Sequence, residues 1–196
     1  MYKEIIKPAL ILFLICIVLT AALAYVNHIT KPIIEENQRL EEQETLIRVF
    51  AEADRFSKEI EADQLRENGF VVPDGVQKLY EAEKDGNLTG YVVVVSTKGY
   101  GGDMNILVGI DINQSITGVV ITSHNETPGL GDKVTNPDFT DQFKGEIPKK
   151  VFSVVQRQAS DDNEIEAVAS ATKSSRAVTD GVADAVAMVR SVIGGD

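Results

Sequence analysis

The chain has 196 residues, 43% of them hydrophobic and 25% charged, and a net charge of −11 at pH 7. This length and composition are typical of one folded domain with its own core and a short appendage. Because Lys3, Glu4 and Lys7 give the first 30 residues a charge of +1, residues 31–196 carry −12, which excludes broad binding to nucleic acid or to anionic lipid surfaces.

Cysteine and histidine are scarce in this chain. Cys16 is the only cysteine and lies inside an apolar N-terminal run, so the sequence predicts no disulfide framework and no cysteine-based metal site. His28 and His124 are the only histidines and are far apart. Their separation disfavours a zinc or haem centre and a Cys–His nucleophilic pair.

An uncharged, largely apolar run extends from Pro8 to Thr30. Because about 20 apolar residues cross a bilayer core, we predict a transmembrane helix over residues 8–30. Two lysines precede the run, so the positive-inside rule places residues 1–7 in the cytoplasm and the chain from residue 31 outside. A cleaved signal peptide is the alternative, because Ala22-Leu23-Ala24 has the form of a cleavage site.

Residues 31–75 are predicted to form a juxtamembrane helical linker. Between residues 33 and 60 the apolar positions are spaced as on one helical face, with charged residues between them. The apolar face of such a helix packs against a partner or against the following domain. A solvated stalk is the alternative.

Residues 76–196 are predicted to form an α+β domain, a mostly antiparallel sheet closed by a C-terminal helix. In the third expected strand, alternation places Ile106, Val108, Ile110 and Ile112 on one face. Past Thr172 the apolar positions return to helical spacing. The expected strands are 76–86, which includes a DG turn, 91–97, 104–112, 116–123 and 151–156.

Two loops after predicted strands have the composition of ligand-binding segments. KGYGGDMN (98–105) offers an aromatic ring among glycines that allow a ligand to come close to the backbone, although a tight turn is the alternative. HNETPGLGDK (124–133) contains a Pro-Gly pair that fits a type II turn, with an acceptor, a donor and a cation at its rim, although a purely structural loop is the alternative. The candidate binding residues are Tyr100, Gly101, Gly102, Glu126, Thr127, Gly129, Leu130, Gly131 and Lys133.

A third segment, AVASATKSSRAVTDGV (167–182), places several hydroxyls before a helix predicted to begin near Ser174 or Ser175. The free N–H groups and the positive dipole end of such a helix accept a phosphate. Thr172 lies just upstream, where its hydroxyl comes near that phosphate. The residues alone leave three roles open: a helix cap, a reversible phosphate site or a covalent ester.

GYGG, HNETPGLGDK and ASATKSS together resemble the covalent FMN-binding domain family of the Rnf complex G subunit, which the C subunit of the sodium-translocating NADH:quinone reductase shares. The resemblance covers the apolar run and about residues 76–193. In that family the last threonine of an (S/T)-G-A-T motif carries FMN through a phosphoester bond, made from FAD by a separate flavin transferase. The resemblance therefore implies that Thr172, preceded by Ala171, carries FMN.

This chain departs from the family motif at three positions. Ala169 and Ser170 stand where the family has Ser/Thr and Gly, and Glu166 stands where the family usually has Asp. Serine fits in place of glycine unless that position requires a positive φ.

The resemblance implies a membrane-anchored flavoprotein subunit of an Rnf-type ferredoxin:NAD+ oxidoreductase. It relays electrons between other subunits that carry flavin and Fe–S centres, and the whole complex couples this to Na+ or H+ translocation, without a complete active site or a metal on this chain. In the implied site the phosphate lies at Ser174 and Ser175, and Lys133 balances negative charge. Residues 127 and 129–131 line the flavin, and residues 100–102 flank it. The alternatives are the related C subunit and an anchored module that binds FMN reversibly or binds no flavin.

Overall fold

The computed structural model describes the backbone of residues 2–194. Its description leaves out the side chains of residues 1–11, 15, 18, 21, 32, 33, 35, 37–39, 195 and 196. The chain forms two compact units, residues 1–44 and residues 45–196. The predicted division at residue 76 is therefore too late, because residues 45–75 belong to the second unit.

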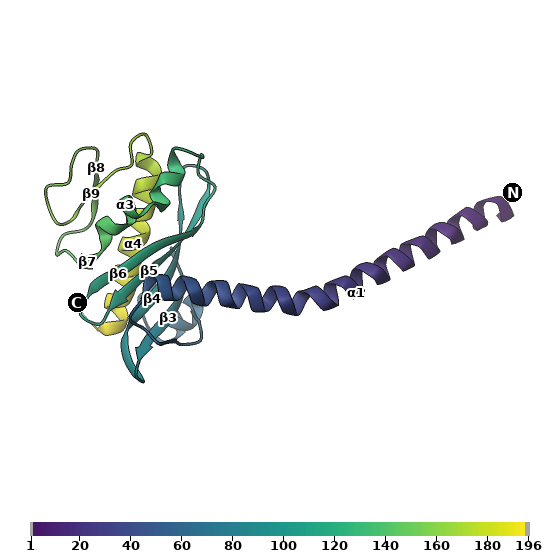
Figure 1. The fold of residues 1–196 in the computed structure, drawn as a ribbon, viewed down its shortest axis with the longest axis horizontal. Helices are drawn as coiled ribbons and strands as arrows, with labels where there is room; N and C mark the ends of the chain where they lie inside the picture. The colour runs from purple at the N-terminus through teal and green to yellow at the C-terminus, as the bar shows by residue number, and fades with distance from the viewer. Residues whose placement is uncertain (1, 195–196) are drawn as a thin grey trace. The chain divides into compact units, whose positions relative to one another are not determined.

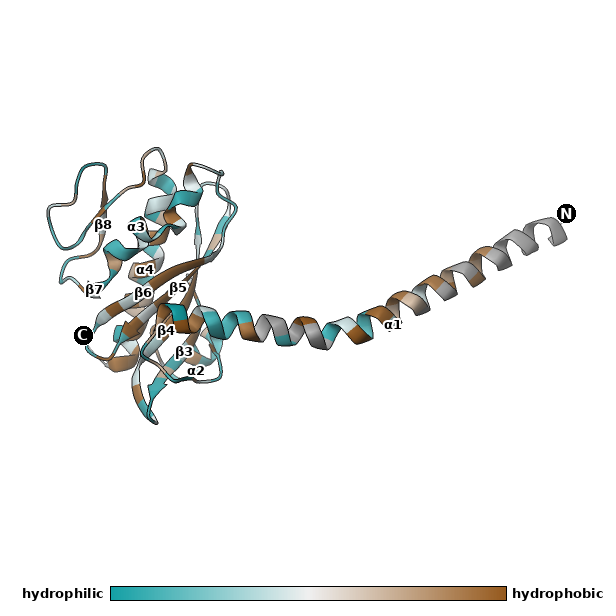
Figure 2. Ribbon diagram, viewed as in Figure 1, coloured by the Kyte–Doolittle hydropathy of each residue, from teal (hydrophilic) through white to brown (hydrophobic). Residues whose placement is uncertain are grey.

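A single long helix, α1 (Tyr2–Val49), makes up the first unit and continues into the second. Figure 2 shows that hydrophobic residues dominate its described N-terminal part and hydrophilic ones its later turns. Within the described residues, no helix is both long enough and apolar enough to cross a membrane. The predicted transmembrane segment, residues 8–30, includes residues 8–11, 15, 18 and 21, whose side chains lie outside the description.

The second unit is built on a seven-stranded antiparallel sheet of order β1-β3-β4-β5-β6-β7, in which β2 also pairs with β3. The predicted DG turn joins β3 to β4, and both Asp85 (φ 51°) and Gly86 (φ 77°) have the positive φ of a type I′ hairpin. The strands are β1 (Arg55–Phe56), β2 (Ile60–Glu61), β3 (Val76–Lys84), β4 (Asn87–Lys98), β5 (Asp103–Asp111), β6 (Ser115–Ser123) and β7 (Gly145–Glu146).

The C-terminal helix α4 (Thr172–Ile193) covers one face of this sheet (Figure 1). Val178, Val182 and Ala185 of the helix pack there against the alternating apolar residues of β4 and β5. The α+β prediction, a mostly antiparallel sheet with a C-terminal helix, is therefore confirmed. The prediction that Ile112 shares the buried face of this strand is wrong. β5 ends at Asp111, and Ile112, the next residue, is 49% exposed.

The last turn of α1 covers the other face of the sheet, together with Phe50. The hydroxyl of Thr117 donates a hydrogen bond of 2.8 Å to the carbonyl oxygen of Val49. Gly118 makes room for this contact, because a Cβ there would lie 2.8 Å from the same oxygen. The linker helix predicted to reach residue 75 therefore ends at Val49, where it packs onto the sheet.

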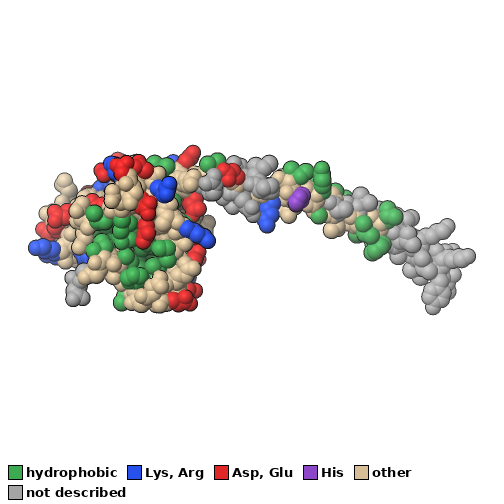
Figure 3. Space-filling model, turned by 90° about the horizontal axis from the view of Figure 1, so that it is seen from below, with side chains coloured by type: hydrophobic (Ala, Val, Ile, Leu, Met, Phe, Trp, Pro, Cys, Tyr) green, Lys and Arg blue, Asp and Glu red, His purple; other side chains and the backbone are tan. Residues whose placement is uncertain are grey.

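Of the remaining elements, the strand at 153–155 and the short helix at 131–135 contact α4, whereas the helix at 62–67 contacts β2 and β3. β8 (Ser153–Val155), within the strand predicted at 151–156, pairs in parallel with β9 (Glu164–Glu166). Figure 3 shows one face of the second unit, where acidic side chains run between hydrophobic ones. The short helices are α2 (Ala62–Glu67), η1 (Gly131–Thr135), α3 (Pro137–Thr140) and η2 (Asp141–Phe143).

Candidate functional site

A cavity of about 350 Å³ brings together the three segments that the sequence singled out. One wall comes from the β4–β5 turn, one from the loop after β6, and one from the start of α4. Its volume lies within the roughly 300–1,000 Å³ of small-molecule sites. The lining residues are Tyr100, Glu126, Thr127, Leu130, Gly131, Ser170, Ala171, Lys173 and Ser174.

Glu126 joins these three segments through its carboxylate. Its Oε1 accepts hydrogen bonds from the backbone N–H groups of Tyr100 (2.7 Å) and Gly101 (3.2 Å). Its Oε2 accepts a hydrogen bond of 2.8 Å from the hydroxyl of Ser174. Glu126 is only 6% exposed, so the prediction that it offers an acceptor at the rim is wrong. Its oxygens are occupied by the protein's own donors.

The glycines of the two loops leave space for this carboxylate. A Cβ at Gly99 would collide with Oε1 of Glu126, and a Cβ at Gly131 would collide with Oε2. A Cβ at Gly101 would collide with the carbonyl oxygen of Asn125. The glycine-rich composition of both segments therefore serves close packing around Glu126. Gly101 and Gly102 form the β4–β5 turn and do not line the cavity.

The Pro128-Gly129 pair forms the turn that the sequence predicted. The N–H of Leu130 donates to the carbonyl oxygen of Thr127 (3.2 Å), and Gly129 has φ of 79°, as the third residue of a type II turn requires. The turn points Leu130 into the cavity, with its side chain 47% exposed. Gly129 shapes the turn and is not part of the lining.

Helix α4 begins at Thr172, two or three residues before the predicted start at Ser174 or Ser175. The N–H groups of Thr172, Lys173 and Ser174 therefore lie in the first turn, where they have no intrahelical acceptor, and the positive end of the helix dipole faces the cavity. The side chains of Ser174 and Ser175, the predicted phosphate position, are both buried and hydrogen-bonded within the protein.

Ser175 fixes the segment that leads into the helix. Its hydroxyl donates to the carbonyl oxygen of Ala171 (3.0 Å) and accepts from the N–H of Val168 (3.0 Å). Its N–H also donates to Ala171. Ser170 has φ of 63° between these anchored residues, so the position that holds glycine in the family motif does require a positive φ.

Thr172, the candidate attachment residue, is half-buried at the first position of α4. Its two neighbours in the chain, Ala171 and Lys173, both line the cavity. Its hydroxyl oxygen accepts a hydrogen bond of 2.9 Å from Nε2 of Gln156. Thr172 itself is not among the lining residues, and its hydroxyl keeps its own proton for donation.

The cation in the cavity wall is Lys173. Its ammonium lies 5.6 Å from the ring centre of Tyr100, whose side chain is 70% exposed. Lys133, the predicted cation, lines a second cavity of about 590 Å³ with Glu166 and Ala169. The sequence reading missed Lys173, which adjacency to Thr172 could have indicated, and Gln156, for which the sequence carries no signal.

Comparison with known proteins assigns this arrangement to a class. Residues 99–187, which contain all three cavity segments, match the FMN-binding domain family. Residues 1–49 match the RnfG N-terminal region. The chain is therefore an FMN-binding-domain protein.

Relatives narrow the class to a family. The G subunit of the Na+-translocating ferredoxin:NAD+ oxidoreductase complex of Acetobacterium woodii is 35% identical over 187 residues, covering 92% of this chain and 89% of the relative. The G subunit of the proton-translocating complex of Clostridium ljungdahlii is 32% identical over 180 residues, with the same coverage. The chain belongs to the RnfG family, the G subunits of ion-translocating oxidoreductase complexes. The resemblance inferred from the motifs is confirmed.

A solved structure shows a similar fold. The crystal structure of Shewanella oneidensis NqrC has a TM-score of 0.50 and 26% identity, over 60% of this chain and 59% of that chain. The RnfG N-terminal match favours the G subunit over the alternative C subunit.

Proposed function

We propose that this chain is the electron-relay subunit of an Rnf-type ferredoxin:NAD+ oxidoreductase and carries FMN through a phosphoester bond to Thr172. The observation that carries the proposal is the position of Thr172 in the first turn of α4, between two residues that line the cavity. The names of the relatives, which are G subunits of ferredoxin:NAD+ oxidoreductase complexes, support the assignment to this reaction.

The residues around the cavity fit a flavin and its phosphate. The free amides at the start of α4 and the Lys173 ammonium offer donors and positive charge to a phosphate. The exposed ring of Tyr100 and the side chain of Leu130 offer flat and apolar surface to a fused ring system. When bound, FMN supplies one-electron transfer between neighbouring redox centres. This chain's own residues hold and orient it.

Attachment at Thr172 requires a flavin transferase and FAD. The Thr172 oxygen forms the new bond to phosphorus, the phosphoanhydride bond of FAD breaks, and AMP leaves with the bonding electron pair. The hydroxyl proton passes to a base on the transferase. The half-buried hydroxyl of Thr172 only accepts a hydrogen bond, which suits this reaction, whereas the hydroxyls of Ser174 and Ser175 are buried and already donate their protons to Glu126 and Ala171.

In-gel flavin fluorescence after denaturing electrophoresis tests the attachment. The full-length chain is co-expressed with a flavin transferase, as wild type, Thr172→Ala and Thr122→Ala, the last removing an exposed hydroxyl on β6. We expect fluorescent bands for wild type and Thr122→Ala and a dark band for Thr172→Ala. A dark wild-type band that still copurifies with FMN would instead identify a module that binds flavin reversibly.

The same proposal places residues 8–30 in the membrane and the second unit outside the cytoplasm, with the other subunits of the complex as partners. Large apolar side chains along α1, from Leu12 to Ile29, are exposed, as expected for a helix surrounded by lipid. Protease treatment of intact spheroplasts should digest the second unit and leave the N-terminal segment in the membrane. Protection of the second unit would contradict this topology.

A further inference from the structure

We propose that Gln156 is a positioning residue that orients the Thr172 hydroxyl for flavin attachment, an inference that rests on the function proposed above. Gln156 is exposed and lies 16 residues before Thr172. Its Nε2 nevertheless donates a hydrogen bond of 2.9 Å to Oγ1 of Thr172. The side chain thus holds the one atom that has to bond to phosphorus.

The direction of this hydrogen bond suits a nucleophile. A hydroxyl oxygen has two acceptor lone pairs and one proton. Donation from Gln156 occupies one lone pair and sets the rotamer of the Thr172 side chain. The other lone pair stays available for attack on phosphorus, and the proton stays available to a base. Holding the oxygen in one orientation favours the near-attack geometry that accelerates such reactions.

The backbone on the N-terminal side of Gln156 is fixed by the small parallel sheet. Val155 pairs with Glu166, and its carbonyl oxygen accepts a hydrogen bond of 2.8 Å from the N–H of Ala167. This strand pairing ties the residue before Gln156 to the segment that leads into α4. It brings two parts of the chain together that no local sequence pattern connects.

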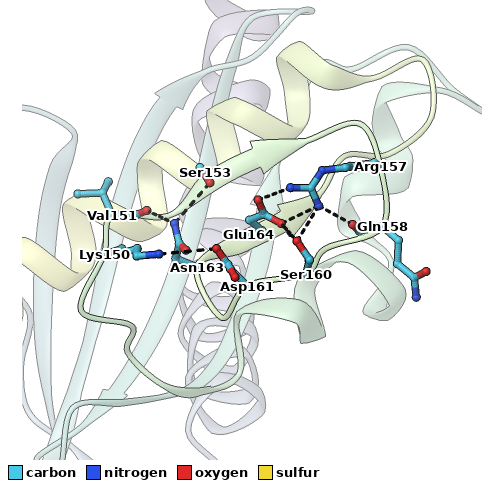
Figure 4. A network of polar contacts seen from close by, with 9 residues as sticks. All are labelled: Lys150, Val151, Ser153, Arg157, Gln158, Ser160, Asp161, Asn163 and Glu164. Atoms are coloured by element: carbon cyan, nitrogen blue, oxygen red, sulfur yellow. Dashed lines mark hydrogen bonds and ion pairs between the residues drawn. The ribbon is translucent and has the colours of Figure 1, made fainter.

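The C-terminal side of Gln156 is fixed by a polar network centred on Arg157 (Figure 4). The guanidinium of Arg157 donates to both carboxylate oxygens of Glu164, at 2.6 and 2.9 Å. Ser160 donates to the same carboxylate through its N–H and its hydroxyl. The backbone N–H of Ser160 and the guanidinium lower the pKa of Glu164 to about 2, so the network stays charged at neutral pH. Gln156 therefore lies between two neighbours that are both held in place.

The neighbouring glutamine, Gln158, provides a matched control. It is also exposed and belongs to the same loop. Its backbone carbonyl oxygen accepts a hydrogen bond from the guanidinium of Arg157. Its side chain lines the second cavity, away from Thr172. Figure 4 shows this side chain pointing away from the network. Truncating it removes an equivalent amide from the same loop and leaves the Thr172 hydroxyl untouched.

The experiment measures flavin attachment at increasing concentrations of the full-length chain, with fixed transferase and excess FAD, by in-gel fluorescence over time. Wild type is compared with Gln156→Ala, Gln156→Glu and Gln158→Ala. Loss of one neutral hydrogen bond should lower kcat about five- to tenfold in Gln156→Ala, with KM unchanged. Gln156→Glu should lose at least as much, because an ionised carboxylate accepts and cannot donate to the hydroxyl. Gln158→Ala should match wild type.

The thermal unfolding midpoints of these variants should agree with that of wild type, because the substituted side chains are exposed. Wild-type kcat in Gln156→Ala, a change confined to KM, or full activity of Gln156→Glu would each overturn the positioning role. Each of these outcomes would leave attachment at Thr172 intact. A wild-type chain that never becomes fluorescent would instead overturn the proposed function, and the positioning role with it.

Discussion

The buried carboxylate of Glu126 accepts a hydrogen bond of 2.8 Å from the hydroxyl of Ser174, although 48 positions separate the two residues. Both are nearly inaccessible, at 6% and 1% exposure. Because the other carboxylate oxygen binds the β4–β5 turn, the three walls of the cavity form one hydrogen-bonded unit. The shape of the site therefore depends on a residue that is itself satisfied by the protein.

Replacing Glu126 by alanine should destabilise the chain. Two backbone N–H groups and the Ser174 hydroxyl would lose their acceptor, which costs about 2–4 kcal/mol of unfolding free energy. Glu126→Gln keeps one oxygen acceptor and should cost about 1 kcal/mol. Urea unfolding of the full-length chain measures both. The exposed Glu146→Gln variant is the control and should stay within about 0.5 kcal/mol of wild type. Equal stability of Glu126→Ala and wild type would show that this carboxylate does not hold the loops.

Replacing either of two glycines in the same loop by alanine should lower the unfolding free energy, for a different physical reason at each position. Gly131→Ala places a methyl group against Oε2 of Glu126, whereas Gly129 has open space around it and a positive φ. We expect Gly129→Ala to cost roughly 1–2 kcal/mol from backbone strain alone. The cost of Gly131→Ala should shrink in a Glu126→Ala background, because the atom it displaces is gone, while that of Gly129→Ala should not. Double-mutant cycles from urea unfolding separate the two, and additive effects of Gly131→Ala and Glu126→Ala would refute the steric explanation.

The central sheet was predictable because its strands are runs rich in β-branched residues, and Ile106, Val108 and Ile110, which share one face, are all fully buried. The inclusion of residues 45–75 in the second unit was not predictable from the sequence, because it depends on contacts between distant segments, such as Val49 with Thr117. The start of α4 was misplaced since its N-cap is Ala171, with no side-chain cap, while the serines that follow resemble caps.

The candidate site likewise has features that the sequence predicted and features that it did not. The motifs identified which segments form the cavity, whereas flavin attachment at Thr172, which the resemblance implies, stays a prediction. The roles of single residues inside the motifs depended on burial, which the sequence does not show. Glu126 lies inside the packing instead of at the rim, and Lys173 replaces Lys133 as the cation of the cavity.

Ser170→Gly should stabilise the chain. Ser170 has φ of 63°, a conformation that costs an L-residue roughly 1–2 kcal/mol, and part of this gain is offset by the larger backbone entropy of glycine in the unfolded chain. We expect a net gain of about 0.5–1 kcal/mol in unfolding free energy. Ala169→Gly, one residue earlier and without positive φ, should instead lose stability. Thermal unfolding of both variants tests this, and a loss in Ser170→Gly would contradict it.

Asp184 should make the chain less stable as pH rises. Burial raises the pKa of this carboxyl, and the nearby carboxylates of Asp180 and Asp74 raise it further. Because the folded state holds the proton more tightly than the unfolded state, the contribution of this group to stability falls as pH rises through the raised pKa. Asp184→Asn should therefore raise the unfolding midpoint at pH 7, and the gain should diminish as pH falls toward 4. Thermal unfolding across this range measures the difference. The exposed Asp162→Asn variant is the control, and a gain that does not change with pH would exclude the titration of Asp184 as its cause.

Lys173 and Lys133 allow a direct test of which cation acts on the flavin. Lys173 lines the cavity beside Tyr100, and Lys133 lines the second cavity. Removing a positive charge near a flavin disfavours reduction, because the reduced form carries more negative charge. A partly exposed charge interaction of about 1 kcal/mol corresponds to roughly 40 mV for a one-electron step. Lys173→Gln should therefore lower the midpoint potential by about this amount, and Lys133→Gln should shift it much less. Spectroelectrochemical titration of the flavin-loaded chains measures both potentials at equal flavin content. A larger shift in Lys133→Gln than in Lys173→Gln would place the flavin ring at the second cavity instead.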